Sequence, residues 1–231
     1  MKRDRVSEAT VARLPSYLRV LVDAATDGAA TISSEHLAQL SGNQPATVRR
    51  DLSSLSITGT RGVGYDVKHL VYEISVVLGV NQEWPVVIVG SGNLGRALAN
   101  YEALADRGFP VRVLIDIDPA LVGQRVAGVV VSPLDQLERL VHEQAITVGV
   151  IATPANAAQD VADHLVAAGV TSLLNFTSTP LVVDDDVQVR GVDLATELQI
   201  LSFYQQRTSS ARDGVGVPLA TLRALEQEAA G

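Results

Sequence analysis

The sequence predicts an α/β protein with two folded domains and a C-terminal helix. Residues 44–68, QPATVRRDLSSLSITGTRGVGYDVK, have the pattern of a helix that runs into a glycine-rich hairpin, as in a winged helix. Residues 86–95, VVIVGSGNLG, have the pattern of a buried strand that runs into a GxGxxG turn. Beyond them, short apolar strands alternate with helices, which is typical of a doubly wound parallel sheet of the Rossmann type.

These patterns divide the chain into four expected segments. We expect a winged-helix domain at residues 1–80 and a Rossmann-type domain at residues 81–193. A helix should follow at residues 194–207, and a flexible tail at residues 208–231.

The composition excludes several classes of protein. Of the 231 residues 47% are hydrophobic, but no run reaches the roughly 18 apolar residues of a membrane span. The N-terminal residues lack the apolar stretch of a secretory signal, so we expect a cytoplasmic protein. There is no cysteine, which excludes disulfides, thiolate metal sites and thiol redox switches. The four histidines are scattered without metal-ligand spacing, so we expect no metal.

The charge is distributed unevenly along the chain. The net charge is −8, but residues 1–84 carry nine basic and nine acidic side chains, and the acidic excess lies entirely in residues 85–231. The first half is therefore neutral, and contact with a polyanion would need a local basic cluster. Arg49, Arg50, Arg61 and Lys68 could form one.

The first domain begins with three predicted helices. Pro15 suits the first turn of a helix that ends at Asp27-Gly28. Ser33 or Ser34 can cap a second helix, which Gly42-Asn43 terminates. Pro45 then starts a third helix that runs to about Leu55.

The third helix has the character of a recognition helix. Val48, Leu52 and Leu55 share one face, while Arg50 points away from that face and Arg49 lies on its flank. A short helix after a tight turn thus presents arginine outward, and arginine can pair with guanine edges in the major groove of DNA. The alternative is a small helical domain with two solvated arginines.

The hairpin that follows can act as a wing. The glycines of TGTRGVGYDV permit a tight turn with Arg61 near its tip, from which it can reach phosphates or a narrow minor groove. The residues that we expect to contact DNA are Thr47, Arg49, Arg50, Ser53, Arg61 and Lys68.

The second domain begins with a dinucleotide signature. Gly90 allows a tight turn, Gly92 lets the backbone approach a pyrophosphate, and Gly95 lets the next helix, RALANYEALADRG, pack on the strand. A second apolar strand ends at Asp116, whose carboxylate can accept both hydroxyls of an adenine ribose and would repel a 2′-phosphate. The pattern favours NAD over NADP. Two alternatives remain: Asp118 as the acid, and a Rossmann-like domain that holds coenzyme A or nothing.

Later strands extend the sheet and supply two loops. Val129–Val131 and Val148–Ala152 are apolar strands separated by an amphipathic helix, and a further helix precedes Leu173-Leu174. Ligands bind beyond the carboxyl ends of such strands, so loops 153–155 and 175–177 should lie near a nicotinamide. The alternative is that they are ordinary connections.

The C-terminal helix is apolar over most of its circumference. Leu194, Leu198, Leu201 and Tyr204 form one stripe with Ile200 and Phe203 beside it, so the helix should be buried. Little chain remains to cover it, and a partner subunit in a symmetric dimer is the expected cover. Packing onto its own domain is the alternative.

Taken together, these motifs resemble the Rex family of bacterial redox-sensing repressors. The resemblance covers residues 4 to about 207 and is carried by TVRRDLS, TRGVGYDV, VVIVGSGNLG, IDIDP and LLNFT. It implies a homodimer whose C-terminal helices are exchanged between protomers. It also implies binding to pseudo-palindromic operator DNA that NADH abolishes, with NAD⁺ competing for the same pocket.

The resemblance also implies roles for individual residues. Arg50 would read bases, with Arg49 beside it and Arg61 in the wing. The adenosine and pyrophosphate would be held by Gly90, Ser91, Gly92, Asn93, Leu94, Gly95 and Asp116. The nicotinamide would be framed by Thr153, Pro154 and Phe176. The domains would be coupled through Arg19, Tyr101 and Asp193.

Two departures from the family pattern bear on the operator. Ser54-Leu55 stands where relatives often have aromatic residues, and Arg50 stands where many have lysine. Either departure can alter the preferred operator without abolishing binding.

The sequence favours a sensor over an enzyme. The main alternative is an NAD-dependent dehydrogenase, but hydride transfer to a carbonyl needs a proton donor, and loops 153–155 and 175–177 contain no histidine or lysine. There is also no separate substrate domain. A module that binds coenzyme A or an adenine nucleotide is the third hypothesis.

Overall fold

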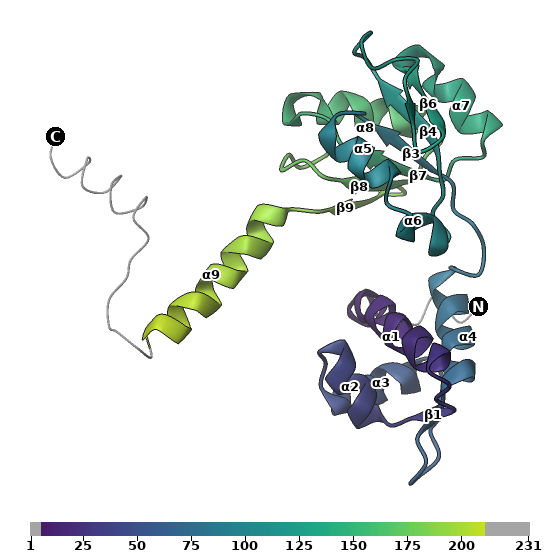
Figure 1. The fold of residues 1–231 in the computed structure, drawn as a ribbon, viewed down its shortest axis with the longest axis vertical. Helices are drawn as coiled ribbons and strands as arrows, with labels where there is room; N and C mark the ends of the chain where they lie inside the picture. Colours follow the sequence, from purple (N-terminus) through teal and green to yellow (C-terminus); the bar gives the residue numbers. More distant parts are fainter. Residues whose placement is uncertain (1–5, 211–231) are drawn as a thin grey trace, which may run out of the picture. The chain divides into compact units, whose positions relative to one another are not determined.

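The structure, a computed structural model, describes residues 6–210 and divides into two units (Figure 1). The N-terminal unit comprises the chain up to Trp84 together with Glu102–Pro110, and the C-terminal unit comprises Pro85–Tyr101 and the chain from Val111 onward. No helix between residues 6 and 210 is both long enough and apolar enough to cross a membrane.

The N-terminal unit is a helical domain with a two-stranded wing. Its elements are α1 (Glu8–Thr26), β1 (Thr31–Ile32), α2 (Ser34–Ser41), α3 (Pro45–Ser54), β2 (Tyr65–Asp66), α4 (Val67–Leu78) and the later α6 (Ala103–Asp106). The predicted ends of the second and third helices are confirmed, with Ser33 capping α2 and Gly42 ending it in a left-handed conformation.

The predicted start of the first helix is wrong. Pro15 lies inside α1, which begins at Glu8 because the Ser7 side chain accepts a hydrogen bond from the Thr10 N–H and caps the first turn. Proline removes one helical donor, whose partner would be the carbonyl of Val11. Val11 is exposed, so water can satisfy that carbonyl.

A single apolar core holds the N-terminal unit together. Val48 and Leu52 of α3 and Leu55 just after it are buried, as their shared face predicts, and they belong to the same core as Leu14 and Leu21 of α1. Burying each such side chain contributes about 1.5–3 kcal/mol. The core therefore buries this face of α3 and leaves its other face outward.

The wing follows α3 and is closed by glycines. β1 pairs antiparallel with β2, and the turn between Thr60 and Gly64 is held by the Thr60 N–H, which donates to the Gly64 carbonyl at 2.8 Å. Gly62 and Gly64 have φ values of 80° and 104°. A Cβ on Gly64 would strike the backbone carbonyl of Ile32, so only glycine fits there.

The C-terminal unit contains a seven-stranded sheet in the order β5-β6-β4-β3-β7-β8-β9. Its strands are β3 (Val86–Val89), β4 (Val111–Asp116), β5 (Arg125–Val126), β6 (Val129–Pro133), β7 (Val148–Ile151), β8 (Ser172–Asn175) and β9 (Gln188–Gly191). Its helices are α5 (Asn93–Ala99), α7 (Leu137–Glu143), α8 (Ala158–Ala167) and α9 (Leu194–Ser210), with short 3₁₀ turns at Leu134–Gln136 and Ala155–Ala157. Six strands are parallel and β5 is antiparallel to β6, so the predicted parallel sheet is confirmed.

Helices cover both faces of this sheet. Val87 and Val89 belong to the core formed with α7 and α8, while the alternate residue Ile88 lies against Gly95 of α5. From β3 the sheet is extended on one side by β4 and then β6. The chain then crosses back, and β7, β8 and β9 extend the sheet on the other side of β3. The point where the strand order reverses therefore lies between β3 and β7, which is where ligands bind in such sheets.

Two details, one of a helix and one of the sheet, differ from expectation. The helix predicted over RALANYEALADRG is broken, because the Asn100 side chain donates to the carbonyl of Arg96 and ends α5 before α6 begins. β5 and β9 are strands that the hydrophobic pattern does not indicate, since β5 has two residues and β9 is largely exposed.

The C-terminal helix is present but is not buried within the chain. Leu194, Leu198, Leu201, Phe203 and Tyr204 are all more than half exposed. α9 continues to Ser210, so the first residues of the expected tail are helical, and residues 211–231 lie outside the described part of the chain. The alternative expectation, that α9 packs onto its own domain, is therefore not met within residues 6–210.

Candidate DNA-binding and nucleotide-binding sites

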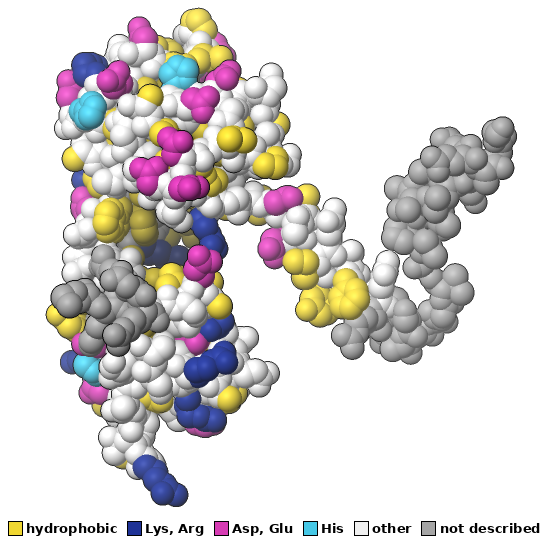
Figure 2. All heavy atoms as spheres, turned by 180° about the vertical axis from the view of Figure 1, so that it is seen from behind, with side chains coloured by type: hydrophobic (Ala, Val, Ile, Leu, Met, Phe, Trp, Pro, Cys, Tyr) yellow, Lys and Arg dark blue, Asp and Glu magenta, His cyan; other side chains and the backbone are white. Residues whose placement is uncertain are grey.

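The outer face of α3 carries the side chains expected to contact DNA. Arg49, Arg50 and Ser53 are exposed there, and Thr47 is partly buried. Lys68 is exposed in the first turn of α4, and Arg61 is exposed in the wing between Thr60 and Gly64. Figure 2 shows Lys and Arg side chains gathered along one side of the N-terminal unit and at the end of its wing. The unit therefore presents a basic surface although its net charge is close to zero.

A buried carboxylate joins α3 to α1. Asp51 of α3 is almost fully buried and accepts two hydrogen bonds from Arg13, at 2.7 and 2.8 Å. Tyr17 Oη donates to it at 2.9 Å and Thr10 Oγ1 at 3.1 Å. These donors lie at positions 10, 13 and 17, on one face of α1, so the arrangement sets the position of α3 on α1 and with it the direction of Arg50.

The titration behaviour of this cluster reflects the ion pair. Burial alone would raise the pKa of Asp51, but the hydrogen bonds from Arg13, Tyr17 and Thr10 outweigh burial and hold that pKa below its usual value. The hydrogen bond to Asp51 raises the pKa of Arg13. Burial, with help from Asp51, raises the pKa of Tyr17 to about 12. Asp51 is therefore ionised and Tyr17 neutral at pH 7.

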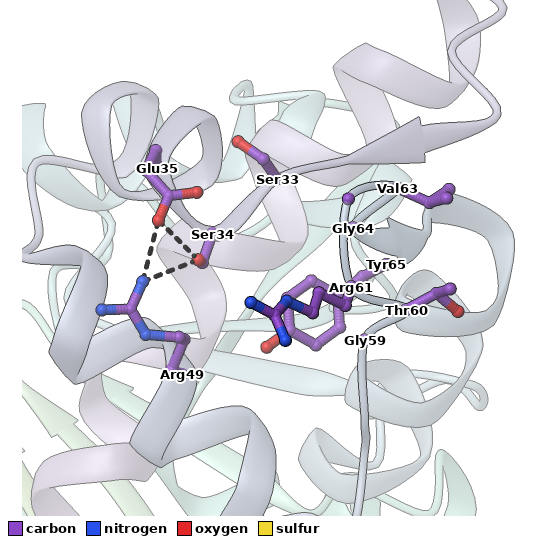
Figure 3. Close-up of a pocket in the computed structure, with 11 residues that line it drawn as sticks. Ser33, Ser34, Glu35, Arg49, Gly59, Thr60, Arg61, Val63, Gly64 and Tyr65 are labelled. Carbon is purple, nitrogen blue, oxygen red and sulfur yellow. Dashed lines mark hydrogen bonds and ion pairs between the residues drawn. The ribbon is translucent and has the colours of Figure 1, made fainter.

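A hollow of about 460 Å³ separates α3 from the wing (Figure 3). Its lining residues are Ser33, Ser34, Glu35, Arg49, Gly59, Thr60, Arg61, Gly62, Val63, Gly64 and Tyr65. Arg49 turns toward the start of α2, where its Nη1 donates to Glu35 Oε1 at 2.8 Å and to Ser34 Oγ at 3.1 Å. Arg61 reaches from the wing toward the same hollow.

The glycine-rich turn lies at the switch point of the sheet. Gly90 has φ 100°, and a Cβ on it would lie 2.5 Å from the carbonyl oxygen of Ala152 at the end of β7. A Cβ on Gly95 would strike the carbonyl of Gly90, whereas one on Gly92 would meet open space. Ser91 is buried, and Asn93 and Leu94 are exposed. The turn is thus closed against the sheet at Gly90 and Gly95 and open at Gly92, the shape that a phosphate group needs.

Asp116 lies at the end of β4, beside this turn. One carboxylate oxygen accepts from the Ser91 N–H at 2.6 Å and the other from the Asp118 N–H at 2.9 Å. The carboxylate therefore shapes the turn, and its remaining lone pairs stay available for ribose hydroxyls. Asp118 accepts from the Ala120 N–H within its own loop, and Ile117 between the two acids is 77% exposed.

The loops after β7 and β8 meet beyond the same end of the sheet. The Phe176 N–H donates to the Ile151 carbonyl at 3.0 Å, which joins the two loops. Phe176 is partly buried and Pro154 is exposed. Thr153 Oγ1 is buried and has no hydrogen-bond partner among the described residues, a costly state for a hydroxyl group. This hydroxyl lies one residue after Ala152, which contacts Gly90, so it marks a place for a polar ligand group next to the glycine turn.

Asn175 organises the second of these loops from within. It is buried, its Oδ1 accepts from the N–H and the hydroxyl of Thr177, and its Nδ2 donates to the Thr179 carbonyl. Both ends of the amide group hold the loop in shape, so Asn175 positions the residues that follow β8.

The three residues expected to couple the domains lie on different elements. Arg19 is exposed on α1, and Tyr101 is 54% exposed between α5 and α6. Asp193 caps the start of α9, where it accepts from the Ala195 and Thr196 backbone N–H groups and from the Thr196 hydroxyl. The Thr196 hydroxyl and these N–H groups lower the pKa of Asp193. Their role in coupling stays a prediction.

The sequence patterns did not single out Asp51 or Glu35, whereas Asn175 lies in a loop that they did indicate. Asp51 could have been found, because it interrupts the apolar face of α3 and an acid on such a face needs a buried partner. Within residues 6–210 no group of three or more potential ligands is arranged to hold a metal ion.

Comparison with known proteins agrees with this division of the chain. A family model described as "CoA binding domain" matches residues 81–179, and one described as "Putative DNA-binding protein N-terminus" matches residues 5–53. The redox-sensing transcriptional repressor Rex of Streptomyces coelicolor is 55% identical over 218 residues, which cover 93% of this chain and 84% of the relative. The chain belongs to the Rex family. The Rex of Desulforamulus reducens is 45% identical over 88% of this chain and 97% of its own length.

Solved structures of a Rex repressor share the whole fold. The structure of the Rex-family repressor RSP has a TM-score of 0.80 at 32% identity, covering 88% of this chain and 95% of RSP. RSP in complex with β-NAD⁺ and operator DNA gives a TM-score of 0.82 at the same identity, covering 90% of this chain and 95% of RSP. RSP has also been solved with β-NADH. The predicted fold class, an α/β chain with an N-terminal DNA-binding domain and a Rossmann-type sheet, is confirmed.

Proposed function

We propose that this Rex protein is a transcriptional repressor that binds operator DNA through its N-terminal unit and leaves it when NADH binds to the C-terminal unit. The observation that carries the proposal is the presence of both sites on one chain, an arginine-bearing recognition helix with a wing and a glycine turn beside an unsatisfied hydroxyl. The operator DNA, NAD⁺ and NADH complexes of RSP, which is 32% identical, support it.

In the DNA-binding half, α3 lies in the major groove. Arg50 contacts base edges, Ser53 and Thr47 contact the neighbouring backbone or bases, and Arg61 of the wing reaches phosphates or the minor groove. Lys68 adds a phosphate contact from α4. The exposure of Arg50 and Ser53 on α3, of Arg61 in the wing and of Lys68 on α4 supports this assignment.

In the nucleotide-binding half, the chain offers complementary groups for each part of NADH. The open backbone at Gly92 approaches the pyrophosphate, and the Asp116 carboxylate accepts hydrogen bonds from the hydroxyls of the adenine ribose. Thr153 supplies a hydrogen bond on the nicotinamide side, with Pro154 and Phe176 against the ring. The dinucleotide supplies the redox state that is sensed, and the protein binds and orients it.

Release of DNA follows from differential affinity. NADH shifts the protein toward the released state only by the ratio of its affinities for the two states. Lowering operator occupancy from 99% to 1% requires about 5.5 kcal/mol of coupling, which two bound cofactors can share in a dimer. Arg19, Tyr101 and Asp193 are the residues that we assign to this coupling.

We assign α9 to the dimer. Apolar side chains cluster on this helix in Figure 2; Leu194, Leu198 and Leu201 are more than half exposed among the described residues, and an exchanged α9 from a second copy would bury them. A two-fold dimer also matches a pseudo-palindromic operator. The protein acts in the cytoplasm, where its DNA and its dinucleotide are both present.

The same site argues against an enzyme. Near the nicotinamide side the loops offer the Thr153 hydroxyl and the Asn175 amide, which holds its own loop, and neither group is a general acid tuned near neutral pH. The match to a coenzyme A binding domain favours one other ligand class. Competition between coenzyme A and NADH for the purified protein separates the two.

The test is fluorescence anisotropy on an operator that the purified protein selects from random DNA duplexes. We expect NADH to release the labelled operator and NAD⁺ to leave it bound. An operator complex that is indifferent to both dinucleotides would contradict the proposed function.

A further inference from the structure

Glu35 places a carboxylate in a hollow that otherwise carries cationic groups. The hollow lies between α3 and the wing, where Arg49 and Arg61 are found, and the Glu35 side chain is 66% exposed. A phosphate that enters this hollow meets a negative charge next to Arg49. The carboxylate repels DNA phosphates there, so its position does not serve to raise the affinity for DNA.

Glu35 holds Arg49 in one defined position. Arg49 Nη1 donates to Glu35 Oε1 at 2.8 Å and to Ser34 Oγ at 3.1 Å, and the Ser34 hydroxyl donates to the same carboxylate oxygen at 3.2 Å. Ser34 is buried at the first position of α2, so it gives the pair a fixed anchor. Half of the Arg49 side chain is exposed, yet its charge is neutralised.

We propose that Glu35 is a specificity-determining residue that withholds Arg49 from general phosphate contact and so weakens binding to DNA without an operator. This inference rests on the proposed function, since it assumes that α3 and the wing face DNA. Arg50, one position along α3, has a different task because it is exposed on the outer face and is assigned to base edges.

The expected effect follows from counterion release. Binding to non-operator DNA is almost wholly electrostatic, and each neutralised phosphate contributes about −0.9 to the slope of log K against log salt. Removing the Glu35 charge frees one cation, so the slope should steepen by about 0.9, and affinity at 0.1 M salt should rise roughly eightfold. The affinity for operator DNA should rise less, because base contacts hold the protein in one register. In non-operator complexes the protein can shift so that any exposed cationic side chain contacts a phosphate.

The experiment compares full-length wild type with Glu35→Gln, which keeps the shape of the side chain and removes its charge. Anisotropy is measured over a salt series on the selected operator and on a scrambled duplex of equal length. Asp23→Asn is the matched control, because Asp23 is exposed on α1 and its loss changes the net charge equally. Glu35→Gln combined with Arg49→Gln tests whether Arg49 carries the effect.

For Glu35→Gln we expect a steeper slope of log K against log salt and tighter binding to the scrambled duplex. The ratio of operator affinity to scrambled-duplex affinity should fall. All of these changes should disappear in the double variant. A wild-type slope, an equal gain for Asp23→Asn, an equal gain on the operator, or a gain that persists without Arg49 would each overturn it while leaving the proposed function intact. If wild type binds neither duplex at low salt, the proposed function is wrong and this inference falls with it.

Discussion

Replacing Asp51 with alanine should destabilise the N-terminal unit, because it removes the acceptor of four hydrogen bonds between α3 and α1. Two of these come from Arg13, one from Tyr17 and one from Thr10. Breaking a buried ion pair from one side costs about 3–5 kcal/mol. The Arg13 side chain is 25% exposed and water can solvate it in part, so we expect a loss of about 2–4 kcal/mol.

The matched variants separate charge from packing. Asp51→Asn keeps the volume and some hydrogen bonds and should cost about 1–3 kcal/mol. Asp23→Asn, on the exposed face of α1, should change stability by less than about 0.5 kcal/mol. Trp84 is the one tryptophan of the chain, and its Nε1 donates to the Gly79 carbonyl within the N-terminal unit. Its fluorescence in urea therefore reports the unfolding of that unit.

The pH dependence has a definite sign. The pKa of Asp51 is lower in the folded state than in the unfolded state, so its stabilisation is present above the unfolded value, near 4, and is lost as the pH falls through the folded value. Wild type should lose more stability than Asp51→Asn on acidification below about pH 4. Equal stabilities for Asp51→Ala and wild type, or parallel acid profiles for Asp51→Asn and wild type, would refute this reasoning.

Four further variants test the two sites and the dimer. Arg50→Ala should weaken operator binding by about 1–3 kcal/mol and relax base preference; unchanged affinity and selectivity in anisotropy would remove Arg50 from base readout. Asp116→Ala should weaken NADH binding and narrow the preference over NADPH in calorimetric titrations, whereas unchanged binding of both would exclude Asp116 as the ribose acid. Thr153→Val should weaken NADH binding by about 0.5–1.5 kcal/mol without lowering the melting temperature, because its hydroxyl has no partner within residues 6–210; a lower melting temperature with unchanged NADH affinity would contradict this role. Leu198→Glu should yield monomers in analytical ultracentrifugation, since it places a charge on the exposed apolar surface of α9; a dimer that persists would assign the interface elsewhere.

The sequence was most informative where apolar residues recur at the spacing of a helix, or where an apolar run ends at a glycine. Val48, Leu52 and Leu55 repeat at helical spacing, and their burial in α3 followed from that spacing alone. The apolar run before Gly90 predicted β3 and its turn for the same reason. In the structure the four residues of β3 are buried and Gly90 has φ 100°.

The remaining features depend on contacts between distant residues. β9 is exposed and polar, and it becomes a strand only because β8 offers it a parallel edge. Ser7 sets the start of α1 through a cap that outweighs the helix-breaking tendency of Pro15. The Glu35–Arg49 pair joins residues 14 positions apart on two helices, and no local pattern indicates it. Glu35 and Arg49 are each ordinary surface residues by composition.

The central claim, that NADH and operator DNA bind to states that exclude each other, is tested most directly by a thermodynamic cycle. NADH affinity is measured by calorimetry on the free protein and on the protein saturated with operator. Because linkage is reciprocal, we expect operator to weaken NADH binding by the same factor by which NADH weakens operator binding. NADH affinity that is equal with and without operator would contradict the account.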